Sequence, residues 1–359
     1  MTSVRSIIRA TALVALMLVG MEVPFAATIV ITIDPAEPVG TGFTDPTPTL
    51  PVGSNLATTL GAQRLFVFQT AANQWASLLK SAVTITVNAK MTSISMGCNG
   101  NSAILGQAGP NGAYADFPNA PKIDVFYPSA LADSLKGSAN TGSSPQIDAT
   151  FNVDIDTGTC LTGKTWWYDT NPAHSIPANK IALLPVVFHE LGHGLGFITF
   201  TNLQTGAFVG PPGGPFLPDI WDLYLFDQAK NKTWAQINPS GAANANIVSS
   251  AINGLNLIWA GARVNKLQKD FLSGSPPSGT HSGCMNMYAP ATLEPGSSVS
   301  HWTKAATPAL LMQPILNQTL FNKVDLTLPL FQDIGWGTNP ENVLFVDGFD
   351  PNPCASVQP

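Results

Sequence analysis

The sequence His-Glu-Leu-Gly-His-Gly-Leu-Gly-Phe, at residues 189–197, decides how the rest of the chain is interpreted. An apolar run comes directly before it, and together they predict a core helix over about 182–195 that ends at the glycines after His193. Pro185 is tolerated because it falls in or near the first turn. On this helix His189 and His193 lie one turn apart on the same face, so both imidazoles can reach one metal ion.

Glu190 lies about 100° further round the same helix, beside such an ion rather than bound to it. There it can take a proton from a zinc-bound water, whose pKa zinc lowers to about 7. Zinc suits two imidazoles better than calcium or magnesium does. So short a motif also arises by chance, but the chain has only five histidines, and unpaired polar groups on an apolar helix are costly. We therefore predict zinc (Zn²⁺) as the cofactor, His189 and His193 as ligands, and Glu190 as the general base.

A third protein ligand is expected, because a catalytic zinc ion usually has three together with a water molecule. The spacing of residues does not identify it. The candidates are the remaining histidines and several carboxylates, namely His174, His281, His301, Asp219, Asp222, Glu294 and Asp333.

Residues 189–197 resemble the active-site helix and glycine turn of the metzincin clan of zinc peptidases. One difference is that Thr199 stands where the usual third histidine of the clan would be. In leishmanolysin-like metzincins that histidine instead follows a long insertion. The run at residues 333–336 also resembles the end of the C-terminal helix in secreted bacterial relatives. The resemblance covers roughly residues 42–336.

The ending of this chain is similar to the leishmanolysin-like pattern, with Ser-His-Trp at 300–302 followed by Leu-Met-Gln-Pro at 311–314. The resemblance implies that His301 is the third zinc ligand, with His281 as the next choice. It also implies that Met312 is the methionine of the Met-turn beneath the metal.

The fold implied is α+β: a metzincin-like two-lobed catalytic domain with an N-terminal mixed sheet, two long helices, and an irregular C-terminal lobe with a Met-turn and a terminal helix. The expected parts are a signal peptide at 1–27, an N-terminal extension at 28–42, an N-terminal catalytic lobe with the zinc helix at 43–198, an insertion at 199–300, a C-terminal lobe at 301–336 and a tail at 337–359.

Hydrophobic periodicity predicts most of the elements. Apolar residues spaced by three and four between Leu65 and Leu79 indicate an amphipathic helix, and alternation over Val83–Ala89 indicates a half-buried strand. The other expected elements are strands at Ile123–Tyr127 and Ile147–Val153 and helices near Ala130–Leu135 and Leu326–Ile334. Residues 199–300 are expected to be irregular, with Pro218–Phe226 the best-ordered apolar segment, and Val343–Phe349 is either a short strand or a sorting signal.

Composition indicates an exported protein without a nucleic-acid partner. Charged residues make up 11% of the chain, against about 25% in a typical soluble domain. Arg5 and Arg9 precede an apolar run too short to span a bilayer, which is typical of a secretory signal, although an uncleaved anchor is the alternative. The net charge is −6 and no basic run occurs, so neither nucleic acid nor stable membrane insertion after signal removal is expected.

Four cysteines, an even number in an exported chain, predict two disulfides. They are Cys98, Cys160, Cys284 and Cys354. The sequence leaves three connectivities open, of which the sequential one would link each lobe internally. None of the four lies in a Cys-x-x-Cys pair, so a cysteine-built zinc site is not expected.

These observations predict a zinc metalloendopeptidase, secreted to the extracellular space or the periplasm, that acts on a protein or peptide substrate. The substrate would lie extended along an edge strand, for which Ile147–Val153 is the candidate. One alternative is a zinc hydrolase of a non-peptide amide or ester; another is a non-catalytic zinc-binding surface protein, which would not need Glu190. No Gly-x-Ser-x-Gly elbow occurs, which disfavours a serine hydrolase. The oligomeric state is left open.

Two further features have open roles. Pro314 stands where some metzincins carry a tyrosine that stabilises the oxyanion, so Tyr288 and His281 are alternative donors, although a structural role is favoured for both. Asp154 and Asp156 suggest a calcium site without defining one.

Overall fold

The computed structural model describes residues 26–339 except 96, 141, 211–214, 316 and 322–323, and it also describes Cys354. The expected signal peptide lies outside these residues apart from its last two, and the segment Val343–Phe349 lies outside them entirely. Within the described residues, no helix is both long enough and apolar enough to cross a bilayer.

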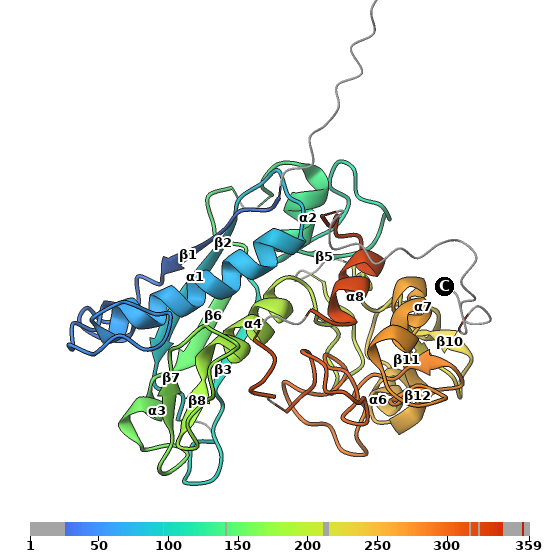
Figure 1. The fold of residues 1–359 in the computed structure, drawn as a ribbon. Coiled ribbons are helices and arrows are strands. Elements are labelled where there is room, and N and C mark those ends of the chain that lie inside the picture. Colours follow the sequence, from blue (N-terminus) through green and yellow to red (C-terminus); the bar gives the residue numbers. More distant parts are fainter. Residues whose placement is uncertain are drawn as a thin grey trace, which may run out of the picture.

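The fold is mixed α+β, as predicted (Figure 1). The eight α-helices of the described residues are α1 (Leu60–Leu78), α2 (Ser129–Lys136), α3 (Asp154–Thr157), α4 (Leu183–Gly194), α5 (Trp234–Ile237), α6 (Ala245–Ala251), α7 (Ala262–Phe271) and α8 (Thr327–Ile334). The strands are β1 (Ile29–Ile33), β2 (Ile85–Thr92), β3 (Gly106–Pro110), β4 (Ala113–Tyr114), β5 (Tyr127–Pro128), β6 (Ile147–Asn152), β7 (Thr165–Trp167), β8 (Lys180–Ala182), β9 (Leu225–Asp227), β10 (Lys232–Thr233), β11 (Leu257–Trp259), β12 (Thr280–His281) and β13 (Cys284–Met285). The 3-10 helices found in the described part of the chain are η1 (Gly42–Thr44) and η2 (Gly254–Asn256).

The largest sheet has four strands in the order β1-β2-β6-β3. The first three run parallel, and β3 runs antiparallel to β6. β6 is therefore internal, so the prediction that Ile147–Val153 lies at an edge is wrong, and β3 is the edge strand beside it. No periodicity predicts β3, because its sequence Gly-Gln-Ala-Gly-Pro contains no β-branched or aromatic residue.

The opposite edge of this sheet is β1, which pairs with β2 from Ile29↔Ile85 to Ile33↔Ala89. β1 lies within residues 28–42, which were expected to precede the catalytic lobe as an extension. The structure instead makes the first part of this segment a strand of the main sheet.

Helices α1 and α4 pack against each other and against this sheet, and Figure 1 shows α1 lying along it. The alternation that predicts β2 is explained by this packing, because every second residue of the strand is buried. At the start of α1, the Thr59 hydroxyl accepts a hydrogen bond from the Ala62 N–H at 3.3 Å, which caps the helix.

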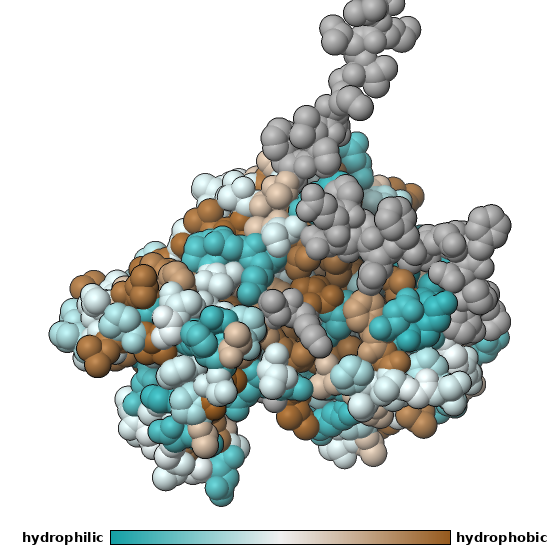
Figure 2. All heavy atoms as spheres, in the orientation of Figure 1, coloured by the Kyte–Doolittle hydropathy of each residue, from teal (hydrophilic) through white to brown (hydrophobic). Residues whose placement is uncertain are grey.

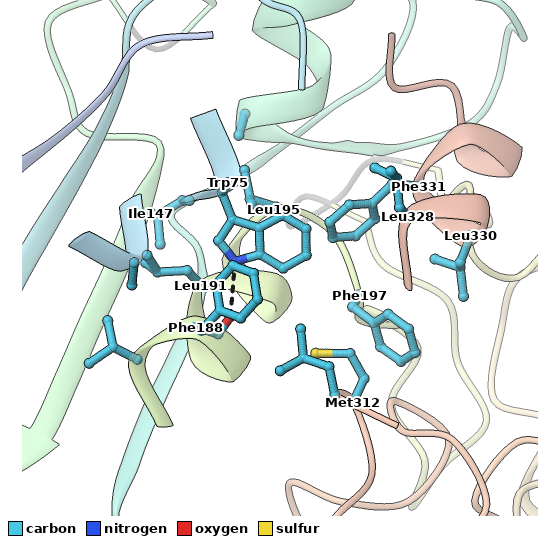
Figure 3. Close-up of a cluster of buried hydrophobic side chains, with 14 of the residues drawn as sticks. Trp75, Ile147, Phe188, Leu191, Leu195, Phe197, Met312, Leu328, Leu330 and Phe331 are labelled. Carbon is cyan, nitrogen blue, oxygen red and sulfur yellow. Dashed lines mark hydrogen bonds between the residues drawn. The ribbon is translucent and has the colours of Figure 1, made fainter. Parts of the chain in front are cut away.

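Trp75 is the point at which three helices meet (Figure 3). It lies on α1, and its indole N–H donates to the carbonyl oxygen of Phe188 on α4 at 2.9 Å. Its ring centroid lies 4.7 Å from that of Phe188 and 5.2 Å from that of Phe331 on α8. This fully buried tryptophan therefore holds the central helix α4 in place.

Most predicted elements are confirmed within a few residues: α1, β2, α2, β6, α4 and α8. The strand predicted at Ile123–Tyr127 is wrong over most of its length, because pairing there is limited to Tyr127, which belongs to β5 and pairs with β4, and to an isolated bridge between Phe126 and Asp219. The backbone of Asp124 has a φ of 56°, which lies outside the β region, and the Ile123 side chain is 75% exposed.

Residues 199–300 contain more regular structure than predicted. β9, β10 and β11 form a three-stranded sheet, β12 and β13 form a hairpin, and α5, α6 and α7 lie among them. These strands have two or three residues each, and three residues are too few for a hydrophobic period to show in the sequence.

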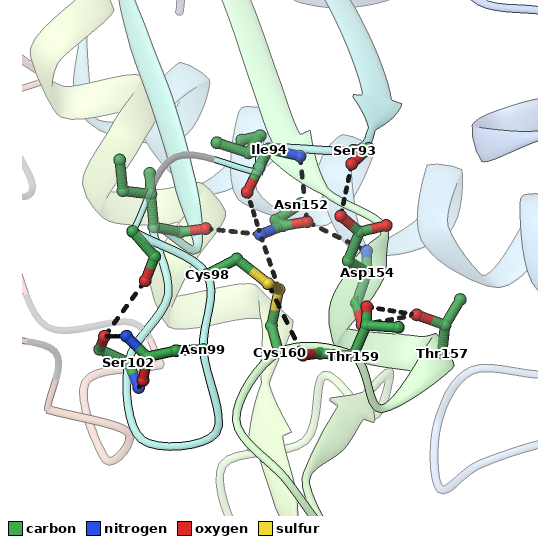
Figure 4. Close-up of a disulfide and its surroundings, with 12 residues drawn as sticks. Ser93, Ile94, Cys98, Asn99, Ser102, Asn152, Asp154, Thr157, Thr159 and Cys160 are labelled. Atoms are coloured by element: carbon green, nitrogen blue, oxygen red, sulfur yellow. Dashed lines mark hydrogen bonds between the residues drawn. A yellow bond between two sulfur atoms is a disulfide. The ribbon is translucent and has the colours of Figure 1, made fainter.

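The two disulfides follow the sequential pairing, Cys98 with Cys160 and Cys284 with Cys354. Asn152, at the end of β6, lies beside the first (Figure 4). Its side-chain amide donates to the carbonyl oxygens of Ile94 at 3.2 Å and Ile104 at 3.0 Å. The disulfide and Asn152 together fix the loop that leads from β2 to the edge strand β3.

Candidate metal centre

Helix α4 carries His189 and His193 and lies unusually close to the sheet. A Cβ atom on Gly194 would lie 2.4 Å from Cγ2 of Ile147 on β6, so only glycine fits at this contact. Gly196 then has a φ of 123°, which glycine adopts without strain and which lets the chain turn after the helix. Two glycines of the motif therefore have structural roles beside the histidines.

Three histidine side chains converge on one point. The Nε2 atoms of His189, His193 and His301 lie 3.2 Å apart in every pair. His193 and His301 are 7% and 4% exposed, and His189 keeps part of its surface accessible. His301 reaches the other two from more than 100 residues further along the chain, after the whole insertion.

The other ring nitrogen of each histidine has a backbone acceptor. The Nδ1 contacts are His189 to the Leu311 carbonyl oxygen at 2.7 Å, His193 to that of Phe197 at 2.7 Å and His301 to that of Ser297 at 2.8 Å. A carbonyl oxygen only accepts, so each Nδ1 carries the proton and each Nε2 presents a lone pair. Three lone pairs facing one another at 3.2 Å repel unless a cation lies between them.

This arrangement fits zinc. Three nitrogen atoms bound to one zinc ion at about 2.0–2.1 Å in tetrahedral geometry lie about 3.3 Å apart, which is close to the spacing found here. Acceptors that hold the non-ligating nitrogen are typical of histidines bound to metals. All three histidines line the cavity described below.

Burial keeps the three imidazoles neutral, the form that binds metals. It lowers the pKa of His189 to about 4 and that of His193 to about 3, and it lowers the pKa of His301 well below the usual value. Because a neutral imidazole needs no deprotonation, the site is ready for a cation at neutral pH.

Glu190 lies at the same cavity and contacts the edge strand. Its Oε2 accepts a hydrogen bond from the backbone N–H of Ala108 on β3 at 3.1 Å. Burial raises the pKa of this carboxyl group to about 8, and the Ala108 hydrogen bond opposes part of that shift. A nearby divalent cation would lower the pKa again, toward the range in which a general base works near neutral pH.

A cavity of about 600 Å³ opens over these groups. Its walls come from β3, α4 and the two segments around His301 and Leu311, and Thr199 also lines it. Figure 2 shows hydrophilic and hydrophobic side chains intermixed on the face drawn, with a notch in its lower outline. The cavity is large enough for several residues of an extended peptide or for a small molecule.

Met312 is fully buried beneath α4. A Cβ atom on Gly192 would lie 2.8 Å from the Met312 sulfur, so the methionine packs directly against the helix between the two histidines. Figure 3 shows its side chain in the same cluster as Phe197. The Met312 carbonyl also accepts the Trp302 N–H at 2.8 Å, which links this turn to the residue after His301.

The other candidate histidines lie elsewhere. His174 Nδ1 contacts Asp169 Oδ2 at 2.5 Å, and His281 Nδ1 contacts Gln228 Oε1 at 2.5 Å. Neither lines the cavity, so His281 has no position from which to act as a ligand or an oxyanion donor.

Tyr288, the other possible oxyanion donor, does not line the cavity, although its backbone N–H donates to the His301 carbonyl oxygen at 2.8 Å. Its hydroxyl donates to Glu294 Oε1 at 2.7 Å. Glu294, a candidate for the third ligand, therefore binds Tyr288 and does not line the cavity. Asp154 accepts the Ser93 hydroxyl at 2.5 Å, and Asp156 binds Arg64 at 2.8 Å, so protein donors occupy both carboxylates that suggested calcium.

Asp219 and Asp222 form a buried pair behind the cavity wall. The Thr199 hydroxyl lies 3.0 Å from Asp222 and 3.4 Å from Asp219, and the Thr201 hydroxyl donates to Asp222 at 2.8 Å. The Phe200 N–H donates to Asp219. Burial raises the pKa of both carboxyl groups, and the charge of Asp222 raises that of Asp219 further. The pair fastens residues 199–201 to the segment 219–222 and binds none of the three histidines.

We expect Asp222→Asn to reduce the pH dependence of stability. A carboxyl group whose pKa is raised by folding contributes stability that is complete below its unfolded pKa of about 3.9 and is lost as pH rises through its folded pKa. The amide does not titrate, so the free energy of unfolding should fall less in the variant between about pH 4 and pH 8, by about 1.4 kcal/mol for each pKa unit of the original shift. Denaturant unfolding at several pH values measures this, and parallel pH curves for the two proteins would contradict it.

Sequence reasoning missed the groups that orient the site. Ala108, Leu311 and Ser297 act through backbone N–H or carbonyl groups, so the identity of their side chains does not predict these contacts. Phe197 could be found, because it follows His193 by four residues at the end of the helix, where carbonyl groups lack helical partners.

Comparison with known proteins yields a match to a protein family. A family model described as SPBPB7E8-like matches residues 55–205, which run from just before α1 to just after α4. No curated protein and no solved structure matches the chain.

Proposed function

We propose that this protein is a zinc-dependent endopeptidase. The observation that carries the proposal is the convergence of three Nε2 lone pairs at 3.2 Å beside a carboxylate, Glu190, in an open cavity. His189, His193 and His301 would hold the ion, and three histidines with an open fourth position are typical of catalytic rather than structural zinc. When bound, zinc would polarise a water molecule and the carbonyl group of the substrate.

Glu190 is proposed as the general base. It takes a proton from the attacking water and later delivers it to the amine nitrogen that leaves as the C–N bond breaks. The Ala108 N–H holds one carboxylate oxygen, which leaves the other free to face the water. A structural zinc site would have no use for this carboxylate.

The edge strand β3 is proposed as the strand along which the substrate lies. The Leu105 carbonyl accepts the Asn152 N–H, and the Asn111 N–H donates to the Gln146 carbonyl, so the odd-numbered positions of β3 direct their backbone groups toward β6. The backbone groups of Gly106 and Ala108 therefore point away from β6. Because the Ala108 N–H is bound to Glu190, an added strand would pair with the backbone groups of Gly106 and with the Ala108 carbonyl group. Pro110 has no N–H, so an added strand would pair only along the first part of β3.

The metzincin-like two-lobed arrangement is part of the proposal. Support comes from the antiparallel edge strand above the zinc helix, from Met312 packed beneath it, and from the separate group of elements that supplies His301. Secretion is proposed from the signal-like N-terminus and the two disulfides, since disulfides persist mainly in oxidising compartments.

The test is hydrolysis of a labelled unfolded protein by the full-length chain, loaded with zinc. We expect cleavage at internal peptide bonds, its loss with a zinc chelator, and its return when zinc is added back. Small ester and amide substrates are run in parallel. Hydrolysis of these alone would favour the non-peptide hydrolase, and a chain that binds zinc but cleaves nothing would overturn the proposal in favour of a non-catalytic zinc protein.

A further inference from the structure

Leu311 links the metal centre to the C-terminal helix through its two backbone groups. Its carbonyl oxygen accepts the Nδ1–H of His189 at 2.7 Å. Its N–H donates to Oδ2 of Asp325 at 2.5 Å. The orientation of His189 therefore depends on a backbone segment that is itself held by a carboxylate.

Asp325 has donors on both of its oxygens. Oδ1 accepts the Thr327 N–H at 3.1 Å and the Thr327 hydroxyl at 2.9 Å, at the start of α8. The side chain is 6% exposed, and burial raises its pKa to about 6. A carboxylate with donors at both ends acts as a clamp between the Leu311 segment and α8, because neither contact can move without breaking a buried hydrogen bond.

We infer that Asp325 is a positioning residue for the metal centre: by fixing Leu311, it sets the rotation of His189 and thereby tightens metal binding. The same segment carries Met312, so the clamp also holds the residue that packs beneath the helix. The inference rests on the proposed metal centre. It concerns affinity for the metal and requires no titration of Asp325.

Asp333 supplies a matched control at the other end of the same helix. Its carboxylate also takes donors on both oxygens: Trp259 Nε1–H at 3.0 Å, Arg263 N–H at 2.9 Å and Val264 N–H at 3.4 Å. Burial raises its pKa to about 6, as for Asp325. It holds the start of α7 and does not line the cavity. This former ligand candidate is thus a carboxylate of the same kind whose hydrogen bonds reach none of the three histidines and none of the backbone carbonyl groups that orient them.

The experiment compares Asp325→Asn with Asp333→Asn in the full-length protein. The amide has one acceptor atom in place of two, so each variant leaves a buried donor unpaired and should lower the melting temperature. Zinc affinity is measured by chelator competition, and the visible spectrum is recorded after Co²⁺ replaces zinc. We expect Asp325→Asn to weaken zinc binding about 10- to 100-fold, which is the range typical of residues that orient metal ligands. We also expect the variant to change the Co²⁺ spectrum.

The expected result for Asp333→Asn is wild-type affinity and an unchanged spectrum despite its lower melting temperature. Equal zinc affinity in the two variants would overturn the inference while leaving the proposed function intact. If the wild type binds no zinc, the proposed function fails and the inference fails with it. Should Asp325→Asn not fold, Thr327→Val replaces it, since it removes only the hydroxyl donor; a loss of affinity of about threefold or more supports the clamp and an unchanged affinity overturns it.

Discussion

Replacing Glu190 with glutamine should lower the rate of hydrolysis of an unfolded protein by about 10²- to 10⁴-fold, the contribution typical of a general base. The amide oxygen can still accept the Ala108 N–H, so the side chain should keep its position on the cavity wall. It cannot accept a proton from water. Activity should therefore fall without loss of the metal, and kcat should fall more than KM changes.

The measurement is the initial rate of hydrolysis beside the zinc content of each purified protein. Glu294→Gln is the control, because its carboxylate bonds Tyr288 and does not line the cavity, so its activity should equal that of the wild type. A Glu190→Gln variant that binds one zinc ion and retains full activity would show that Glu190 is not the general base and that hydrolysis follows a different mechanism.

Replacing His301 with alanine should weaken zinc binding by roughly 10²- to 10⁴-fold, because one of three protein ligands carries about a third of a binding free energy of about 10–16 kcal/mol. The variant keeps the helical pair His189 and His193, which are 3.2 Å apart at Nε2 but cannot enclose the ion alone. When zinc is limiting, the rate of hydrolysis by the variant should fall as its affinity for zinc falls.

The controls for this change are His281→Ala and His174→Ala, the other histidines of the chain. Both lie away from the cavity with partners of their own, Gln228 and Asp169, so zinc affinity should stay at the wild-type value. Chelator competition gives the affinities. Loss of zinc in His281→Ala but not in His301→Ala would overturn the ligand set.

Local sequence predicts the helix of the site to within about one residue, since α4 spans Leu183–Gly194 against an expected 182–195. The reason is that an apolar run with a helical period needs no distant partner to be recognised. α8 is predicted for the same reason, and β6 is predicted because apolar and polar residues alternate along it. β3 is not, because its residues have little intrinsic preference for a strand and form one only by pairing with β6.

The sequence by itself determined the pair His189 and His193, the position of Glu190 beside them, and the likeness that singled out His301 and Met312. It did so because helical spacing places residues four apart on one face whatever surrounds the helix. Tertiary structure alone decided that His301 reaches the pair, that Ala108 on an unpredicted edge strand contacts Glu190, and that Leu311 and Asp325 orient His189. The contacts of Glu190 with Ala108 and of His189 with Leu311 join segments separated by 82 and 122 residues, and they form through backbone groups that every residue carries. A backbone group has no identity in a sequence, so its role becomes visible only when the chain has folded around it.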